Sequence, residues 1–256
     1  MSATDEIRDY WDTDAATYDR SASHHPSTPL QRSAWRGALS TLLPPTPAQR
    51  VLDVGAGTGF LSLLLSELGH EVTAADLSAQ MLQQLSRKAA ADERSITVVE
   101  SDATHVPAGP YDVVVSRHLL WLLPDPHEAL RRWRQSTVES GRLVLVDNLW
   151  GPSASPAERA RRTGQLALSR LRGNPPAHHA ELDPQIRAQL PLGHGPSPAE
   201  LVDAVRAAGW EAPQLHRLAG VEWARRSELA WPERLLGVSP CFAVVAENTA
   251  ARAGQP

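Results

Sequence analysis

The stretch 51-VLDVGAGTGF-60 is the most informative part of this sequence, because three glycines, Gly55, Gly57 and Gly59, lie between two apolar runs. A tight turn from a strand into a helix needs residues that adopt positive φ and let a ligand approach the backbone. In an open α/β sheet such a turn lies at the carboxyl ends of the strands, where ligands bind. Two interpretations are open at this point: a nucleotide-binding loop, or a strand-to-helix turn that binds nothing.

Strand-like and helix-like segments alternate around this stretch, from residue 49 to residue 150. The strand-like segments are nearly continuous in apolar residues, whereas the helix-like segments carry them at helical spacing. The alternation predicts a parallel sheet covered by helices on both faces, which right-handed crossovers make a doubly wound, Rossmann-like α/β core. The expected strands are 50–55, 70–76, 95–101, 111–116 and 142–148, and the expected helices are 60–69, 78–93 and 125–140.

The pattern changes after Trp150, where the sequence becomes rich in Pro, Arg and Ala and shows one helical segment but no strand. Two later strands, 211–219 and 241–247, complete a seven-stranded sheet. Ser78, Asp125 and Ser197 precede helical segments and are expected to cap them. The expected organisation is a helical N-terminal cap (1–44), a Rossmann-like core (45–150), a helical lid insertion (151–195), the C-terminal part of the core (196–248) and a disordered tail (249–256).

The composition is that of an ordinary globular protein, with 42% hydrophobic and 21% charged residues among 256. The net charge of −4 argues against a nucleic-acid partner, which usually requires a basic face. The acidic N-terminus lacks the apolar region of a signal peptide, and no apolar run approaches the roughly 20 residues of a membrane span. The single cysteine, Cys241, fits a reducing compartment. We therefore expect a cytoplasmic protein with no membrane partner, present as a monomer or homodimer.

The carboxylate of Asp53 distinguishes between two kinds of nucleotide ligand. The dinucleotide fingerprint G-x-G-x-x-G has its third glycine three positions after the second, where this sequence has Phe60. A pyrophosphate needs the positive end of a helix, and Asp53 would repel it unless burial or protonation removed the charge. S-adenosylmethionine has no phosphate and carries an ammonium and a sulfonium group. The acid therefore favours S-adenosylmethionine over a dinucleotide.

Two more aspartates end predicted strands at the same edge of the sheet. Asp76 follows Gly55 by 21 residues, which suits a carboxylate that binds ribose hydroxyls. Asp102 ends the third strand and could meet the adenine amino group. A single aspartate at a strand end is as often a turn-former as a ligand. Three such acids at one edge favour a binding site.

With these features together, the sequence resembles the class I S-adenosylmethionine-dependent methyltransferases, and most closely the small-molecule enzymes of bacteria. The resemblance rests on the stretches VLDVGAGTGF, GHEVTAADLSAQML, VVESDA, YDVVVSRHLLWLLPDP and GRLVLVDNLW. It is close from residue 10 to residue 150 and looser over the remainder. One departure is VESGRL, residues 138–143, where the family usually has a Pro-Gly-Gly turn before the fifth strand.

The resemblance implies S-adenosylmethionine as cofactor, with S-adenosylhomocysteine as its product. It also implies that residues 10–19, YWDTDAATYD, form a cap helix that closes over the cofactor. The methionine moiety would be bordered by Asp53, Gly55 and Gly57, with Tyr18 near its carboxylate and Ser116 near its amino group. The nucleoside would be held by Asp76 on the ribose, Leu77 and Met81 flanking the adenine, and Asp102 with Ala103 facing the adenine edge.

The acceptor side is predicted from the residues that follow the fourth and fifth strands. Because methyl transfer is an in-line displacement at an activated carbon, the protein must mainly align the acceptor and exclude water. His118 is the candidate base, since its pKa class suits proton removal near neutrality; a structural histidine at the sheet edge is the alternative. The candidate acceptor contacts are Arg117, Trp121, Asp147, Asn148 and His25. The alternatives are an ion pair for Arg117, core packing for Trp121, helix or loop capping for Asp147 and Asn148, and a surface position without a role for His25.

We therefore expect a methyltransferase that acts on an oxygen or nitrogen atom, with carbon less favoured, of a small metabolite. A role in natural-product tailoring rests on family analogy alone. An NAD(P)-dependent oxidoreductase and a non-catalytic S-adenosylmethionine-binding protein are the alternatives. The lid insertion would set acceptor specificity and exclude water. His178, His179 and His194 match no compact metal motif, so we expect no metal.

Overall fold

The structure is a computed structural model of the 256-residue chain. It describes residues 3–21, 24–44, 48–150, 156–171, 182–231 and 233–249, without the side chains at 162, 166 and 169–171. Several parts of the predicted organisation lie outside these residues: 151–155 and 172–181 of the expected lid, which include His178 and His179, and the tail from 250 onward.

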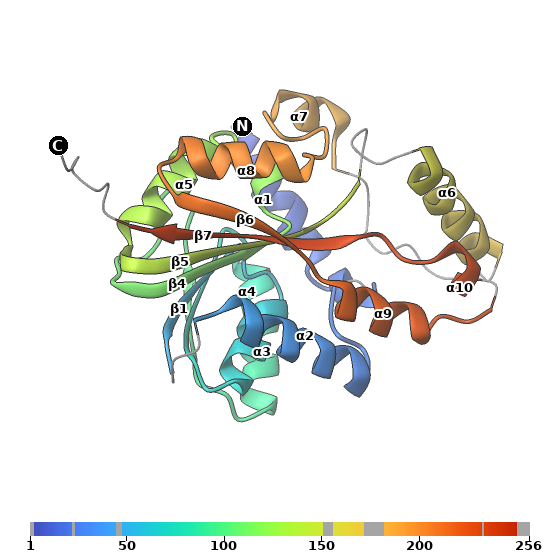
Figure 1. The fold of residues 1–256 in the computed structure, drawn as a ribbon, viewed down its shortest axis with the longest axis horizontal. Coiled ribbons are helices and arrows are strands. Elements are labelled where there is room, and N and C mark those ends of the chain that lie inside the picture. Colours follow the sequence, from blue (N-terminus) through green and yellow to red (C-terminus); the bar gives the residue numbers. More distant parts are fainter. Residues whose placement is uncertain are drawn as a thin grey trace.

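The described residues form one seven-stranded sheet with the order β3-β2-β1-β4-β5-β7-β6. The first five strands pair in parallel, and β7 runs antiparallel to both of its neighbours. The predicted doubly wound α/β fold is therefore confirmed (Figure 1). The strands are β1 (Arg50–Val54), β2 (Glu71–Asp76), β3 (Ile96–Glu100), β4 (Tyr111–Arg117), β5 (Thr137–Asn148), β6 (Glu211–Arg217) and β7 (Cys241–Asn248).

Helices cover both faces of the sheet and give it two hydrophobic cores. One core lies under α2 (Pro29–Leu42), α3 (Phe60–Glu67) and α9 (Ala219–Ser227). The other lies under α5 (Pro126–Gln135) and α8 (Pro198–Ala207), on the opposite side of the sheet in Figure 1. Successive side chains of a strand point to opposite faces, so Val51 enters the first core and Leu52 the second. This two-sided burial explains the nearly continuous apolar strands.

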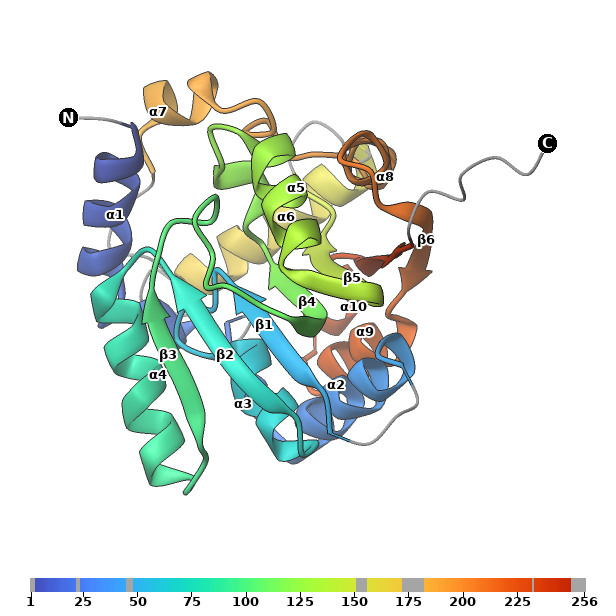
Figure 2. The same cartoon turned by 90° about the vertical axis from the view of Figure 1, so that its left-hand side faces the viewer.

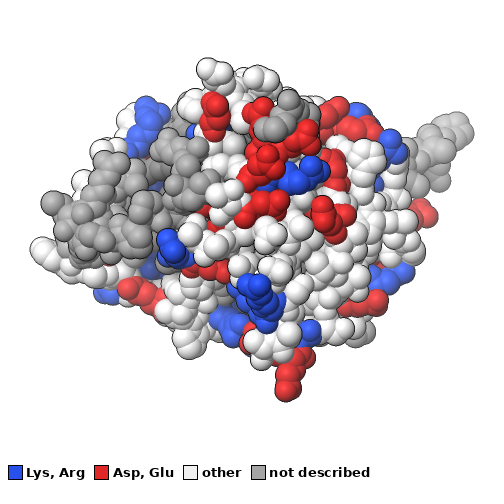
Figure 3. Space-filling view, turned by 180° about the vertical axis from the view of Figure 1, so that it is seen from behind, with Lys and Arg blue, Asp and Glu red and all other residues white. Residues whose placement is uncertain are grey.

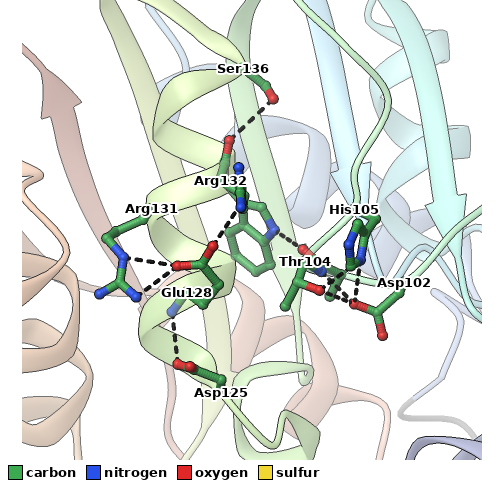
Figure 4. A network of polar contacts seen from close by, with 10 residues as sticks. Asp102, Thr104, His105, Asp125, Glu128, Arg131, Arg132 and Ser136 are labelled. Carbon is green, nitrogen blue, oxygen red and sulfur yellow. Dashed lines mark hydrogen bonds and ion pairs between the residues drawn. The ribbon is translucent and has the colours of Figure 1, made fainter.

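Local capping chemistry sets where the helices begin, as the sequence predicted. Ser78 accepts a hydrogen bond from the backbone N–H of Met81 at the start of α4 (Ala79–Ala91). Asp125 accepts one from Glu128 N–H at the start of α5 (Figure 4). Ser197 and Glu200 form a reciprocal capping box at the start of α8. Each cap satisfies backbone donors that have no partner within the helix.

Two expectations about element boundaries were wrong or incomplete. The helix predicted over 125–140 ends at Gln135, and β5 begins at Thr137. Thr137 pairs with Tyr111 of β4, and β-branched residues such as Thr137 and Val138 favour strands. The sequence reasoning also did not predict α9 and α10 (Glu233–Leu236), which lie between β6 and β7.

The N-terminal helix and a helix of the insertion lie side by side at the end of the sheet that carries the glycine loop. Ile7 of α1 (Ala3–Asp14) shares a small apolar cluster with Ile186 of α7 (Pro184–Gln189) and with Leu190. Leu77, which follows β2, packs against this cluster. Figure 2 shows α1 and α7 adjacent to each other. The remaining elements are η1 (Tyr18–Arg20), η2 (Leu120–Leu122) and α6 (Pro156–Leu171).

The surface carries both signs of charge. On the face shown in Figure 3, basic side chains occur in small separate groups, whereas acidic side chains gather in the upper part. Of the helices described, none is both long and apolar enough to span a bilayer.

Candidate active site

The glycine loop joins β1 to α3 and leaves open space beside its central residue. Gly57 and Gly59 have φ of +54° and +94°, in the left-handed region that favours glycine. A Cβ on Gly59 would lie 2.2 Å from Cδ1 of Leu85, so this glycine is required by packing. A Cβ on Gly57 would meet no protein atom within 4 Å. Gly57 therefore borders space that a ligand can occupy.

Asp53 is a buried acid at the base of this loop. Its residue is 1% exposed, and its Oδ2 accepts a hydrogen bond of 2.6 Å from Ser62 Oγ. Burial raises the pKa of Asp53 to about 7, and the charge of Asp76 adds to the rise, while the Ser62 bond opposes it. The carboxyl group is therefore poised between its neutral and charged forms near neutral pH, and a nearby cation would stabilise the charged form.

Asp76 ties the glycine loop to the end of β2. Its Oδ2 accepts from the backbone N–H of Gly57 at 2.8 Å, and its Oδ1 accepts from Ser78 N–H at 2.9 Å. Burial raises its pKa, and these two hydrogen bonds oppose the rise. Each carboxylate oxygen has a second lone pair, so Asp76 retains capacity for the predicted ribose hydroxyls.

A cavity lies between the glycine loop and the end of β4. Arg117, which the sequence predicted to contact the acceptor, lines this cavity together with Asp53 and Gly57. Its guanidinium carbon lies 4.0 Å from the ring centroid of Phe60. Burial raises the pKa of Tyr18 to about 12, so its hydroxyl stays neutral. The lining residues are Tyr18, Asp53, Gly55, Ala56, Gly57, Thr58, Phe60, Leu61 and Arg117.

The cap segment is fastened to the loop by contacts that the sequence reasoning did not identify. Asp19 accepts a hydrogen bond of 2.7 Å from Thr58 Oγ1, and its other oxygen lies 2.5 Å from Lys88 Nζ. Asp12 of α1 accepts a hydrogen bond of 2.5 Å from Ser78 Oγ. These partners are 39 to 69 residues apart in sequence, and no local pattern connects them.

On the acceptor side, the structure brings three predicted residues together. His118 follows β4 with φ of +58°, and its Nδ1 lies 2.9 Å from Oδ1 of Asp147. The side-chain amide of Asn148 lies 3.3 Å from His118 Nε2, and Asn148 N–H donates to Asp147 Oδ1 at 2.7 Å. A proton on Nδ1 satisfies both ring contacts and leaves the lone pair on Nε2. Nε2 is then the nitrogen that can take a proton.

The charges around His118 act in opposite directions on its pKa. Burial lowers it most, and the charge of Arg117 lowers it further. Asp147 raises it through its charge and its hydrogen bond, and Arg225 of α9 lowers it. His118 is therefore neutral at physiological pH, as a general base requires. It lines a small cavity with Ser116, Leu119, Leu120, Leu145, Val146, Asp147 and Leu201.

The two other predicted acceptor contacts lie in other environments. Trp121 packs edge-on against Trp150, with ring centroids 5.0 Å apart, and the guanidinium of Arg187 lies 4.7 Å from the Trp150 ring. The buried Nδ1 of His25 has no hydrogen-bond partner among the residues that the structure describes. Trp121 thus links the core to the insertion, whereas His25 lines neither of the two cavities described above.

Several residues predicted to face the cofactor make structural hydrogen bonds. Asp102 accepts from Thr104 N–H at 2.7 Å and so forms a turn (Figure 4). The carbonyl of Ala103 accepts from Trp133 Nε1 at 2.7 Å. Ser116 Oγ donates to the carbonyl of Val54 at 2.8 Å and so joins β4 to β1. Met81, predicted to flank the adenine, is buried in α4. His194 of the insertion lies elsewhere, with its Nε2 2.9 Å from Glu200 Oε1.

Comparisons with known proteins agree with this geometry. Residues 52–145 match a family described as "Methyltransferase domain". The demethylmenaquinone methyltransferase of Mycolicibacterium paratuberculosis is 32% identical over 195 residues, which cover 74% of this chain and 76% of that protein.

Solved structures of methyltransferases share the fold. An S-adenosylmethionine-dependent methyltransferase from Aquifex aeolicus has a TM-score of 0.56 and 15% identity, covering 84% of this chain and 89% of that one. The magnesium protoporphyrin IX methyltransferase of Synechocystis, solved with bound S-adenosylhomocysteine, has a TM-score of 0.57 and 16% identity and covers 96% and 99% of the two chains. At these identities the likeness shows the fold alone.

Proposed function

Because the chain belongs to the class I S-adenosylmethionine-dependent methyltransferases, we propose that it methylates an oxygen or nitrogen atom of a small metabolite, with His118 as the base. Membership of this family sets aside the oxidoreductase alternative. The observation that carries the proposal is the pairing of His118 with Asp147 at the ends of β4 and β5, next to the cavity that contains Asp53.

The residues of the cavity fit the cofactor. The buried carboxyl of Asp53 suits the ammonium group of the methionine moiety, and the space beside Gly57 admits a ligand close to the backbone. Asp76 keeps lone pairs for the ribose. When bound, S-adenosylmethionine supplies a methyl group that its sulfonium makes electrophilic. The site itself must hold the acceptor in line and remove its proton.

His118 and Asp147 perform the proton transfer in this proposal. Asp147 accepts a hydrogen bond from Nδ1–H of His118 and so leaves the lone pair on Nε2 for the acceptor. The acceptor O–H or N–H loses its proton to Nε2 as the methyl group is attached. The buried carboxylate of Asp147 then stabilises the imidazolium that forms. The amide of Asn148 contacts Nε2 in the structure, so in this proposal it must turn aside when the acceptor binds.

The identity of the acceptor is the finer part of the proposal. The M. paratuberculosis relative is named for a quinone substrate, which favours a flat ring as the acceptor. Phenols and aromatic amines are therefore the first class to test, with ring-carbon methylation as the less favoured outcome. Natural-product tailoring remains an analogy with small-molecule methyltransferases.

The test is turnover on a panel of phenols, amines and quinols, followed as the mass gain of one CH2. Wild type should methylate at least one of these, and His118→Ala should lose turnover while it still binds S-adenosylhomocysteine. His105→Ala is the control, since that side chain is exposed. Equal turnover by His118→Ala would refute the base assignment. Cofactor binding without turnover on any acceptor would favour the non-catalytic alternative.

A further inference from the structure

Arg117 is a partly buried cation that lines the cavity of the glycine loop and directly precedes the proposed base in the chain. Its side chain lines the cavity that also contains Asp53 and Tyr18. The next residue, His118, turns to line the second cavity, together with Asp147. Arg117 ends β4, His118 follows it with a positive φ, and the two side chains line different cavities. The charge of Arg117 therefore lies in one cavity and directly beside the residue that lines the other.

The methionine end of the cofactor is a zwitterion and needs one group of each sign. Asp53 is the acid in the cavity lining and suits the ammonium. Arg117 is the cation in the same lining, among the residues that the structure describes. Tyr18, which stays a neutral hydroxyl donor, lies close enough to Arg117 for the guanidinium charge to lower its pKa against the larger effect of burial. The carboxylate of the methionine moiety is therefore expected beside Arg117 and Tyr18.

We propose that Arg117 makes the proton affinity of His118 depend on the cofactor, because the cofactor carboxylate compensates the guanidinium charge beside the base. His118 then becomes a stronger base when a ligand that carries this carboxylate is bound. This inference rests on the proposed function, in which His118 takes the acceptor proton.

The charged groups around His118 support this coupling. Arg117 from β4 and Arg225 from α9 face it as cations, and Asp147 from β5 faces it as the anion. After burial, Arg117 is the largest influence that lowers the pKa of His118. Compensation of this one charge leaves Asp147 as the dominant electrostatic neighbour. The pKa of His118 must then rise, which increases its driving force for proton removal.

The test is an NMR titration of the His118 ring in protein labelled at histidine, with the resonance assigned by His118→Gln. The ring is titrated in the free protein, with S-adenosylhomocysteine, and with decarboxylated S-adenosylhomocysteine, which lacks the carboxylate. The expected result is a rise in the His118 pKa of about one pH unit with S-adenosylhomocysteine, and little change with the decarboxylated analogue. Calorimetry on the same samples establishes that each ligand is bound.

Two variants separate the charge of Arg117 from its packing. Arg117→Met removes the charge and should raise the His118 pKa in the free protein, so that S-adenosylhomocysteine produces no further rise. Arg117→Lys keeps the charge and should keep the response to ligand. If Arg117→Met does not fold, the comparison of the two ligands on wild type decides the matter.

The outcomes distinguish this inference from the proposed function. Bound S-adenosylhomocysteine that leaves the His118 pKa unchanged, or shifts it as much as the decarboxylated analogue does, overturns the inference alone. An unchanged pKa in folded Arg117→Met also overturns it. Failure of wild type to bind S-adenosylhomocysteine overturns the proposed function, and the inference with it.

Discussion

Asp53→Asn should make the protein more stable while it removes cofactor binding. The wild-type carboxyl is buried, and its pKa is raised from 3.8 to about 7. Because the pKa of Asp53 is higher in the folded state, folding favours its protonated form. This stabilisation is complete below the unfolded pKa of 3.8 and is lost as the pH rises through the folded pKa of about 7. Asparagine has no charge to bury, and its carbonyl can still accept the Ser62 hydrogen bond. The variant therefore avoids the penalty that wild type carries above neutrality.

The magnitude follows from the size of the pKa change. Each pKa unit corresponds to about 1.4 kcal/mol, so the shift of Asp53 destabilises wild type by at most roughly 4 kcal/mol at about pH 8. Because part of this penalty is already present at about pH 5, the advantage of Asp53→Asn should grow by about 2–3 kcal/mol between these conditions. In a domain of this size each kcal/mol changes Tm by about 2–4 °C, so the difference amounts to several degrees.

The assay combines thermal unfolding across pH with calorimetry. The Tm of Asp53→Asn should exceed that of wild type by a margin that widens as the pH rises, and S-adenosylhomocysteine should no longer raise it. Asp112→Asn is the matched control, because Asp112 forms a partly exposed ion pair with Arg50 at 2.8 Å and its loss should slightly destabilise the protein. A margin that does not depend on pH, or undiminished ligand binding, would refute the reasoning.

Three further predictions concern the same site. Gly57→Ala should fold with a penalty of about 1–2 kcal/mol for its left-handed conformation and bind S-adenosylhomocysteine at least about tenfold more weakly. Gly59→Ala should instead lower the melting temperature, because its Cβ would clash with a neighbouring side chain. A calorimetric affinity of Gly57→Ala equal to that of wild type would contradict the first expectation. Asp147→Asn should reduce kcat by about 100-fold with ligand binding intact, and the acid limb of the pH profile should move to lower pH because Asp147 raises the His118 pKa; an unmoved limb would exclude the pairing from catalysis. Asp76→Ala should weaken cofactor binding by about 1–3 kcal/mol in a titration, and unchanged affinity would remove Asp76 from the site.

The fold and the cofactor loop could be predicted from the sequence because their causes are local. Hydrophobic periodicity distinguishes strand from helix within a few residues, and this predicted the five parallel strands around Gly55. The caps at Ser78, Asp125 and Ser197 depend on side chains three residues or fewer from the backbone donors that they satisfy. The roles of Asp53 and Asp76 toward a cofactor stay predictions, but their convergence on the glycine loop follows from their places at strand ends.

What the sequence by itself determined is therefore the order of the elements, the positive-φ loop and the acids at the strand ends, since each reflects a preference of the local backbone. Only the tertiary structure decided how the site is closed and divided. The contacts of Asp19 with Thr58 and Lys88 join segments that meet through folding alone. Arg117 and His118 line different cavities, and the other residues of each lining come from elements far apart in the sequence. Side-chain direction beyond a strand end is set by what the neighbouring elements pack against, and no periodicity in the chain encodes it.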